Sequence, residues 1–215
     1  MSKDSISSLD KLINERRSIR KYKTEMPPED WIISMIHCAT RAPSPINSQP
    51  VRFIRISSPE MKDKLYEAMV SGRQKMLKSL ETQGKPKRLR NWINSYWRFA
   101  EFMFKAPVLL AVGTVLSTQS FSERLFEAGL IEKNARSSTD VDITIGLALK
   151  GFLLKGEELG LGSCILTAPL VFISNIEEIL EIKDIRIKCL VTAGLPDEEP
   201  RLLERKSVEE VYVKG

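Results

Sequence analysis

The stretch APVLLAVGT, Ala106 to Thr114, decides how the rest of the chain is organised. It contains the longest apolar run, Val108 to Val112, which is far shorter than the roughly 20 apolar residues of a membrane-spanning helix. A short run of this kind predicts a buried central strand. No other stretch approaches the length of a membrane span, so we expect no membrane partner.

Helices and short strands are predicted on both sides of this strand. Helical spacing and helix-start signals predict a helix from Ser7 to near Arg16, one from Pro28 to before Pro43, one from Ser58 to Gly84, one over Asp140–Leu159 and one from a capping box of Ser174 and Glu177 to Leu180. Strands are predicted over Val51–Ser57, Cys164–Ala168 and Ile187–Ala193. There is no repeat and no low-complexity linker, so a single domain over residues 1–215 is expected.

The composition indicates an ordinary globular chain. A net charge of +5 arises from 33 basic and 28 acidic residues, so the charge is mildly basic and does not by itself suggest a nucleic-acid partner. Cys38, Cys164 and Cys189 are odd in number and widely spaced, and the first residues lack the order of a signal peptide. These features favour a reducing, cytoplasmic location.

Several kinds of active site lack their motifs. No GxGxxG follows a predicted strand, and no GxxxxGK[ST] occurs. His37 is the only histidine, so a nucleophile–histidine pair could be built only around it, and one histidine with three scattered cysteines does not make a zinc site. We therefore predict no metal and no catalytic side chain. A bound anionic cofactor would then carry the chemistry.

The basic segment ERRSIRKY, Glu15 to Tyr22, follows the first predicted helix. Arg16 and Ser18 suit a phosphate group, because a guanidinium and a hydroxyl both donate hydrogen bonds to it. In an extended segment Arg20 projects to the same side as Ser18 and could meet a second electron-rich group of the same ligand. The alternative is that basic residues at a helix C-terminus only face solvent and favour the helix dipole.

Four motifs together resemble the FMN-dependent nitroreductase family in order and spacing. They are RRSIRKY, APSPINSQPVRF (Ala42 to Phe53), LGLGSC (Leu159 to Cys164) and RKSVEEV (Arg205 to Val211), and they cover nearly the whole chain. The family usually has Trp after Gln-Pro, where this chain has Val51, and a pair of small residues where it has Thr167 and Ala168. These departures concern the substrate pocket more than the flavin site.

The resemblance implies an α+β fold with a central mixed, mainly antiparallel sheet flanked by helices. It also implies an intertwined homodimer with FMN at the interface, and a variable helical or lid insertion at about residues 85–136. The segment Ser117 to Arg136 lacks a clean period, which is typical of such a lid.

The resemblance also implies the flavin site. Arg16, Arg17 and Ser18 match positions that hold the FMN phosphate and ribityl chain, joined by Arg205 or Lys206 and less well by Arg201. Arg20 matches a cation near flavin N1 and O2, and the backbone of Leu166, Thr167 and Ala168 matches the strand end that faces N5. The residues that match the lining of the ring, largely from the partner subunit, are Pro43, Ser44, Pro45, Asn47 and Gln49. The prolines could instead be only turn formers, and Asn47 could cap its own turn.

The implied reaction passes hydride from NADH or NADPH, through the flavin, to a nitroaromatic, a quinone or a similar conjugated electrophile in a ping-pong exchange. The aromatic residues that could stack over the ring, or could instead belong to the core, are Trp92, Tyr96, Trp97 and Phe121. Two alternatives stay open. Residues 85–105, where basic and aromatic side chains alternate, could form a non-catalytic anion or nucleic-acid binding surface, or the chain could consume flavin on the same fold.

Overall fold

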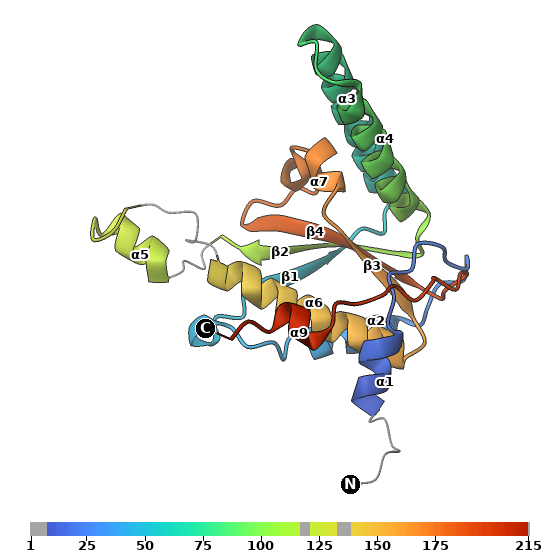
Figure 1. The fold of residues 1–215 in the computed structure, drawn as a ribbon, viewed down its shortest axis with the longest axis vertical. Helices are drawn as coiled ribbons and strands as arrows, with labels where there is room; N and C mark the ends of the chain where they lie inside the picture. The colour runs from blue at the N-terminus through green and yellow to red at the C-terminus, as the bar shows by residue number, and fades with distance from the viewer. Residues whose placement is uncertain (1–7, 117–120, 133–138, 215) are drawn as a thin grey trace.

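A four-stranded sheet forms the centre of the computed structural model, which describes residues 8–116, 121–132 and 139–214 (Figure 1). The strands are β1 (Val51–Arg55), β2 (Val108–Val115), β3 (Gly162–Leu166) and β4 (Ile185–Gly194), in the spatial order β1-β2-β4-β3. All three pairings between them are antiparallel, and Ser18 adds an isolated parallel bridge to Ser163. The expected mainly antiparallel sheet between helices is confirmed.

The central strand predicted from APVLLAVGT is β2, and its side chains enter two different cores. Val108, Leu110 and Val112 face one side of the sheet, whereas Leu109 and Ala111 face the other. This alternation follows from the two-residue period of a strand. Because both faces are covered by helices, β2 is buried almost throughout and reads as a continuous apolar run.

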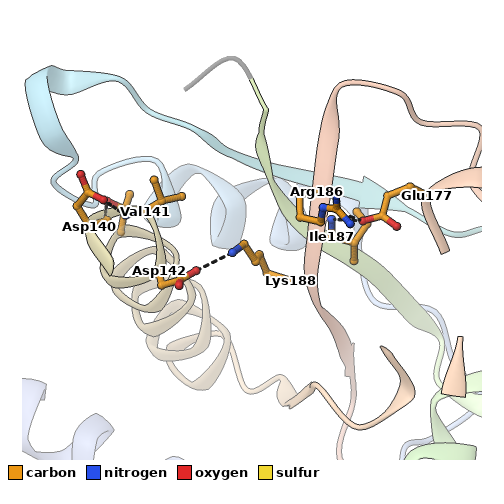
Figure 2. Close-up of polar contacts among 8 residues, drawn as sticks. Asp140, Val141, Asp142, Glu177, Arg186, Ile187 and Lys188 are labelled. Carbon is orange, nitrogen blue, oxygen red and sulfur yellow. Dashed lines mark hydrogen bonds and ion pairs between the residues drawn. The ribbon is translucent and has the colours of Figure 1, made fainter. Parts of the chain in front are cut away.

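One face of the sheet is covered by α2 (Glu29–Ala39) and α6 (Thr139–Glu158). Phe152 of α6 stacks on Phe53 of β1, with ring centroids 5.4 Å apart. Near the start of α6, Lys188 Nζ of β4 donates to Asp142 Oδ1 at 2.8 Å (Figure 2). The long apolar helix predicted over Asp140–Leu159 is therefore confirmed as part of the core.

The other face is covered by a helical hairpin and two short helices. The hairpin consists of α3 (Pro59–Thr82) and α4 (Lys87–Glu101), followed by the 3₁₀ turn η2 (Phe102–Lys105), and the short helices are α7 (Pro169–Phe172) and α8 (Ile176–Ile179). The Ser58 hydroxyl caps α3 by accepting from the backbone of Met61 at 3.3 Å. A side chain at Gly72 would collide with the Phe172 carbonyl, so glycine lets α3 approach α7 closely. The hairpin extends well beyond the sheet (Figure 1).

The remaining described elements lie outside these layers. They are α1 (Ser8–Glu15), the 3₁₀ turn η1 (Pro45–Asn47), α5 (Phe121–Glu127) and α9 (Val208–Val211). Helix α5 forms inside the segment whose sequence has no clean period, while residues 117–120 and 133–138 of that predicted lid, like Ser7, lie outside the described residues. No helix in the described ranges is long and apolar enough to cross a membrane.

Several local predictions were wrong. Strand β1 ends at Arg55 and not at Ser57, and β4 begins at Ile185 and not at Ile187. Two further differences have a clear physical reason. The strand expected over Cys164–Ala168 begins and ends two residues earlier, as β3, because Gly162 and Ser163 pair with Gly194 and Ala193. Glycine and serine have low strand propensity, which hides this start. A side chain at Gly162 would lie 2.5 Å from Ile19 Cγ1, so the close approach of Ile19 explains the glycine.

The capping box expected at Ser174 and Glu177 does not form. Asn175 occupies the N-cap of α8 without a side-chain hydrogen bond. Glu177 is instead used to tie α8 to β4: its Oε1 accepts from the Ile187 backbone at 2.9 Å and lies 3.8 Å from Arg186 Nε (Figure 2). The competing contact with the sheet therefore decides the position of this side chain.

Candidate functional site

The basic segment after α1 is fixed to the sheet by its backbone. Ile19 donates to the Ser163 carbonyl at 3.1 Å, and Lys23 donates to Leu195 O at 2.9 Å. In the chain that follows β4, the backbone N–H of Asp197 donates to Lys21 O at 3.0 Å. The segment thus lies between the start of β3 and the chain that leaves β4, so the side chains of Arg16 to Lys21 are held beside the sheet edge.

The Tyr22 side chain holds this segment in place through two hydrogen bonds. Its hydroxyl donates to the Ile19 carbonyl at 2.5 Å and lies 2.8 Å from Thr192 Oγ1, a fully buried group of β4. Burial raises the pKa of the Tyr22 phenol well above its usual range, and the Thr192 hydrogen bond opposes this rise only partly. Tyr22 therefore stays a neutral hydrogen-bonding group and fixes the backbone that carries Ser18 and Arg20.

The side chains of Arg16, Ser18 and Arg20 lie close enough to Cys164 of β3 to affect the pKa of its thiol. Burial raises the pKa of the Cys164 thiol, and the Arg20 guanidinium, a hydrogen bond from Ser18 and the Arg16 guanidinium act in the opposite direction. Three of the predicted phosphate and flavin ligands are therefore brought together around one strand residue. We call Arg16, Arg17, Ser18 and Arg20 the cationic junction.

Part of the Arg17 guanidinium forms hydrogen bonds to the backbone at the end of α1. Its Nη1 donates to the carbonyls of Asn14 and Arg16 at 2.5 and 2.8 Å, where α1 ends and its carbonyls lack helical partners. Its Nε is buried and has no hydrogen-bond partner in the described part of the chain. A buried donor without a partner points to a missing ligand on that side.

Arg16 lies near the carboxyl group of Glu157 but forms no ion pair with it in the described part of the chain. Burial raises the pKa of the nearby Glu157 carboxyl, an effect that Arg16 and Arg17 oppose. Within the described ranges no carboxylate forms an ion pair with Arg16. The junction thus presents a guanidinium that is half-buried but not neutralised by a direct partner.

Within the cationic junction, Arg20 also borders a charged cavity. Its backbone N–H donates to Glu198 Oε1, which also accepts from Lys21 N at 3.0 Å. The Arg20 side chain helps to line a cavity of about 480 Å³. The charged residues of this cavity are Arg20, Lys21, Arg98, Lys105, Glu101 and Asp197.

The other end of β3 opens into an apolar cavity. Leu166 ends the strand and is buried, and Thr167 and Ala168 then turn into α7. These two residues line a cavity of about 520 Å³ together with side chains from α3, α4 and α7. We call it the hairpin cavity. Its other lining residues are Met76, Leu80, Leu89, Trp92, Ile93, Tyr96, Val171 and Phe172.

The loop from Pro43 to Gln49 has unusual backbone geometry. Ile46, Asn47 and Gln49 have φ angles of 48°, 57° and 44°, the left-handed region that non-glycine residues rarely adopt. Gln49 N donates to Ser44 Oγ at 2.9 Å, and Gln49 Nε2 donates to Asn47 Oδ1 at 3.2 Å. The side-chain oxygen of Asn47 therefore already accepts a hydrogen bond from Gln49. Concentrated backbone strain of this kind is typical of functional loops.

This loop lies away from the cationic junction within one chain. Asn47, Ser48 and Gln49 line a separate cavity of about 500 Å³ between α2, β1 and α6. The Ser48 hydroxyl is buried and has no hydrogen-bond partner in the part of the chain that the structure describes. No described hydrogen bond or cavity connects the loop to Arg16 or Ser18, so one chain does not bring the two predicted halves of the site together.

The predicted basic residues of the tail are also separate from the junction. Every described residue from Arg201 to Lys214 is exposed, and no described contact joins Arg201, Arg205 or Lys206 to Arg16. Ser207 and Glu210 form a capping box at the start of α9, with Ser207 N donating to Glu210 Oε2 at 2.8 Å.

The aromatic residues of the middle segment have different environments. Trp92 and Tyr96 line the hairpin cavity, but Trp97 is buried, packs edge-on against Phe172 and lies under the Arg73 guanidinium. Phe121 is exposed on α5 and lines none of the three cavities described above. Arg90 is paired with Glu81, and Arg98 lies beside Glu101, so these two arginines have acidic neighbours.

Sequence reasoning missed several residues that shape the site. Tyr22 and Glu198 hold the backbone of the junction, and Leu80 and Val171 line the hairpin cavity. The acidic run after β4 is the signal that could have indicated Glu198. The wall residues of the cavity carry no such signal, because only the packing of α3, α4 and α7 brings them together. In the described ranges no cluster of three or more His, Cys, Asp or Glu could hold a metal ion.

Comparison with known proteins gives consistent results. Residues 13–195 match the model of the Nitroreductase family. The iodotyrosine deiodinase of Thermotoga neapolitana is 27% identical over 201 residues, which are 92% of this chain and 93% of the relative. A BluB-like flavoprotein from Clostridium difficile 630 has a similar structure, with a TM-score of 0.81, 27% identity, and coverage of 97% of this chain and 99% of that chain. An iodotyrosine deiodinase solved with FMN and 3-iodo-L-tyrosine has a TM-score of 0.67 at 25% identity, covering 93% of this chain and 96% of that chain.

Proposed function

The chain belongs to the nitroreductase family, and from this premise we propose that it is an FMN-dependent oxidoreductase that passes hydride from NADH or NADPH to a nitroaromatic, a quinone or a similar conjugated acceptor. The observation that carries the proposal is the arrangement along β3, with the cationic junction at its start and the hairpin cavity at its end. A strand rises by about 3.3 Å per residue, so Ser163 and Thr167 are about 13 Å apart. This span suits an elongated cofactor with an anionic end and a flat ring.

The donors of the junction fit the phosphate end of FMN. Arg17 Nε is a buried donor without a partner among the described residues, and no described carboxylate pairs with Arg16. Guanidinium groups and a hydroxyl form strong, charge-assisted hydrogen bonds to phosphate. We infer that Arg16, Arg17 and Ser18 hold the phosphate and ribityl chain.

The chain's own residues then position the ring. FMN supplies the two-electron chemistry at its N5 atom when bound. Arg20 places a cation at the N1 and O2 edge, where a fixed positive charge favours the reduced state. The backbone of Leu166 to Ala168 would face the N5 atom of the bound cofactor, and Thr167 and Ala168 also line the hairpin cavity. The donor and the acceptor would bind in turn at this place, which makes the exchange ping-pong.

The rest of the site is proposed to come from a second copy in a homodimer. The Pro43–Gln49 loop lies away from the junction of its own chain, and its buried Ser48 hydroxyl lacks a described partner. The exposed tail has apolar side chains with no described burial, at Leu202, Leu203, Val208, Val211, Tyr212 and Val213. A partner that covers these side chains would bring its loop to the ring and its Arg205 or Lys206 to the phosphate.

One other activity has support of its own, and a second stays open as an alternative. Reductive deiodination is favoured by the likeness to iodotyrosine deiodinases. Consumption of flavin is the alternative within a flavin-binding fold. Turnover of NADH or NADPH with a nitroaromatic acceptor, at constant flavin absorbance, would separate the proposed reaction from flavin consumption.

The test is a visible spectrum of the protein after supplementation with FMN and desalting. We expect a retained flavin spectrum that bleaches under anaerobic NADH or NADPH and recovers when a nitroaromatic or a quinone is added. In the quinone reaction the nicotinamide gives two electrons and one proton, solvent gives the second proton, and the hydroquinone leaves. A protein that retains no flavin, or whose flavin neither nicotinamide bleaches, would contradict the proposal.

A further inference from the structure

The hairpin cavity exposes large aromatic side chains to solvent. Trp92 and Tyr96 are each 59% exposed, and both line this cavity from α4. They are one helical turn apart and therefore lie on the same face of the helix. Aromatic side chains left open in a concave apolar surface are typical of ligand sites, since a ligand covers them when it binds.

The described residues that line the hairpin cavity carry no charge. Among the described residues that line it, the polar side-chain groups are the hydroxyls of Tyr96 and Thr167 and the indole N–H of Trp92. The neighbouring cavity at Arg20 has the opposite character, with four basic and two acidic residues. The apolar wall therefore offers no partner for an ammonium or a carboxylate group, and such a group would lose hydration there without compensation.

We propose that the hairpin cavity binds the electron acceptor, and that it accepts flat, uncharged aromatic molecules and discriminates against amino-acid zwitterions. The inference rests on the proposed function and names the acceptor class for its site. It separates this chain from the related deiodinase that was solved with 3-iodo-L-tyrosine, a zwitterionic substrate.

The redox step with such an acceptor is balanced. A nitroarene takes two electrons and two protons, loses one oxygen as water and becomes a nitrosoarene. The nicotinamide supplies the two electrons and one proton as hydride, and solvent supplies the second proton. No charged side chain of the cavity is required, because the acceptor is neutral before and after the step.

Tyr96 is proposed as a specificity-determining residue, and α4 offers a matched control for it. Phe99 lies on the same helix and is also 59% exposed, but it does not line the cavity. Loss of a stacking aromatic side chain weakens binding by about 1.4 kcal/mol, which is about tenfold. Tyr96→Ala should show this loss and Phe99→Ala should not.

The experiment measures the binding of 4-nitrotoluene and 4-nitro-L-phenylalanine to the FMN-supplemented protein. The two probes share the nitroaryl ring, and only the second carries the zwitterion. Quenching of tryptophan emission gives the dissociation constants, and neither variant changes a tryptophan. We expect 4-nitrotoluene to bind at least about 100-fold more tightly, in line with the cost of desolvating unpaired charges. We also expect Tyr96→Ala to weaken it about tenfold and Phe99→Ala by less than about twofold.

Three results would overturn the inference. These are equal affinities for the two probes, no binding of 4-nitrotoluene, and equal effects of Tyr96→Ala and Phe99→Ala. The bleaching of flavin by NADH or NADPH reports separately on the proposed function. A protein whose flavin bleaches but which binds both probes equally keeps the function and loses the inference. A protein that discriminates between the probes, but whose flavin is not bleached, keeps the inference about the cavity and loses the proposed function.

Discussion

The cationic junction and the hairpin cavity lie at opposite ends of β3 and are built in different ways. The junction uses residues within five positions of one another, held by backbone hydrogen bonds to β3 and to the chain after β4. The hairpin cavity uses side chains from α3, α4 and α7, which only tertiary packing brings together. The charged end of the site is therefore formed by residues that are neighbours in the sequence, whereas the apolar end forms only when distant helices pack together.

The two regions should therefore respond differently to substitution. Changes in the junction should alter the retention and the potential of the cofactor, because they remove charge or loosen the backbone that carries it. Changes in the hairpin cavity should alter the choice of acceptor and leave the cofactor in place.

Arg16→Ala should weaken FMN binding about 100-fold, since loss of hydrogen bonds to a charged group costs about 1.5–3 kcal/mol. Titration of FMN fluorescence measures the dissociation constant. Arg90→Ala is the control, because Arg90 is paired with Glu81 on the hairpin, away from the junction. Equal FMN affinity in the Arg16→Ala and wild-type proteins would remove Arg16 from the phosphate site.

Tyr22→Phe should lower the free energy of unfolding by about 2 kcal/mol, because the Ile19 carbonyl and the Thr192 hydroxyl both lose a partner in a buried setting. Urea denaturation measures this change. FMN affinity should also fall, by a few fold, since the backbone of the junction is no longer fixed. A loss of stability with unchanged FMN affinity would show that Tyr22 supports the fold and does not position the site.

The stability of the wild-type protein should also fall at high pH because of Tyr22. Burial raises the folded-state pKa of this phenol, so above about pH 10 the unfolded chain loses the proton while the folded chain keeps it. This linkage lowers the free energy of unfolding by up to about 1.4 kcal/mol per pH unit above pH 10. The Tyr22→Phe protein should lack this contribution in urea titrations between pH 9 and 11. Parallel pH profiles for the two proteins would contradict the assignment.

Arg20→Ala should lower the reduction potential of bound flavin and slow its reduction by nicotinamide. Removal of a partly exposed cation is worth about 1 kcal/mol, which is about 20 mV for a two-electron couple. A dye-linked titration of the flavin measures the potential, and urea denaturation checks that the fold is intact. An unchanged potential would count against the placement of Arg20 at the N1 edge.

Ile46→Gly should stabilise the flavin-free protein by about 0.5–1 kcal/mol, because glycine adopts the left-handed region without a steric penalty but loses more entropy on folding. Ile46 has a φ of 48° and is 87% exposed, so little burial is lost. Thermal and urea unfolding measure the change. Destabilisation of similar size would show that the side chain is buried against a second copy, and the strain explanation would fail.

Much of the fold could be predicted from the sequence, because its signals are local. Spacing and residue type were enough to predict the apolar run of β2, the Ser58 cap of α3 and the end of α1 before Arg16. The clustering of Arg16, Ser18 and Arg20 was equally predictable, since five positions of extended chain keep them on one edge.

The remaining features depend on contacts that residue type does not encode. The start of β3 at Gly162 was missed because glycine has a low strand propensity. The glycine is needed there because a side chain would collide with Ile19. Glu177 resembles a capping residue but binds the Ile187 backbone. The positive φ of Ile46 is opposite to the preference of a β-branched residue, and the walls of the hairpin cavity come from distant helices.

The central claim is that the hairpin cavity and the flavin ring form one continuous site. The most direct measurement is the visible absorption of the oxidised FMN protein during titration with 2-naphthol, an uncharged aromatic ligand that the flavin does not reduce. The account predicts a shift of the flavin bands that saturates together with the quenching of tryptophan emission, and that is weakened by Tyr96→Ala but not by Phe99→Ala. Quenching without any change in the flavin bands would place the cavity away from the ring and contradict the claim.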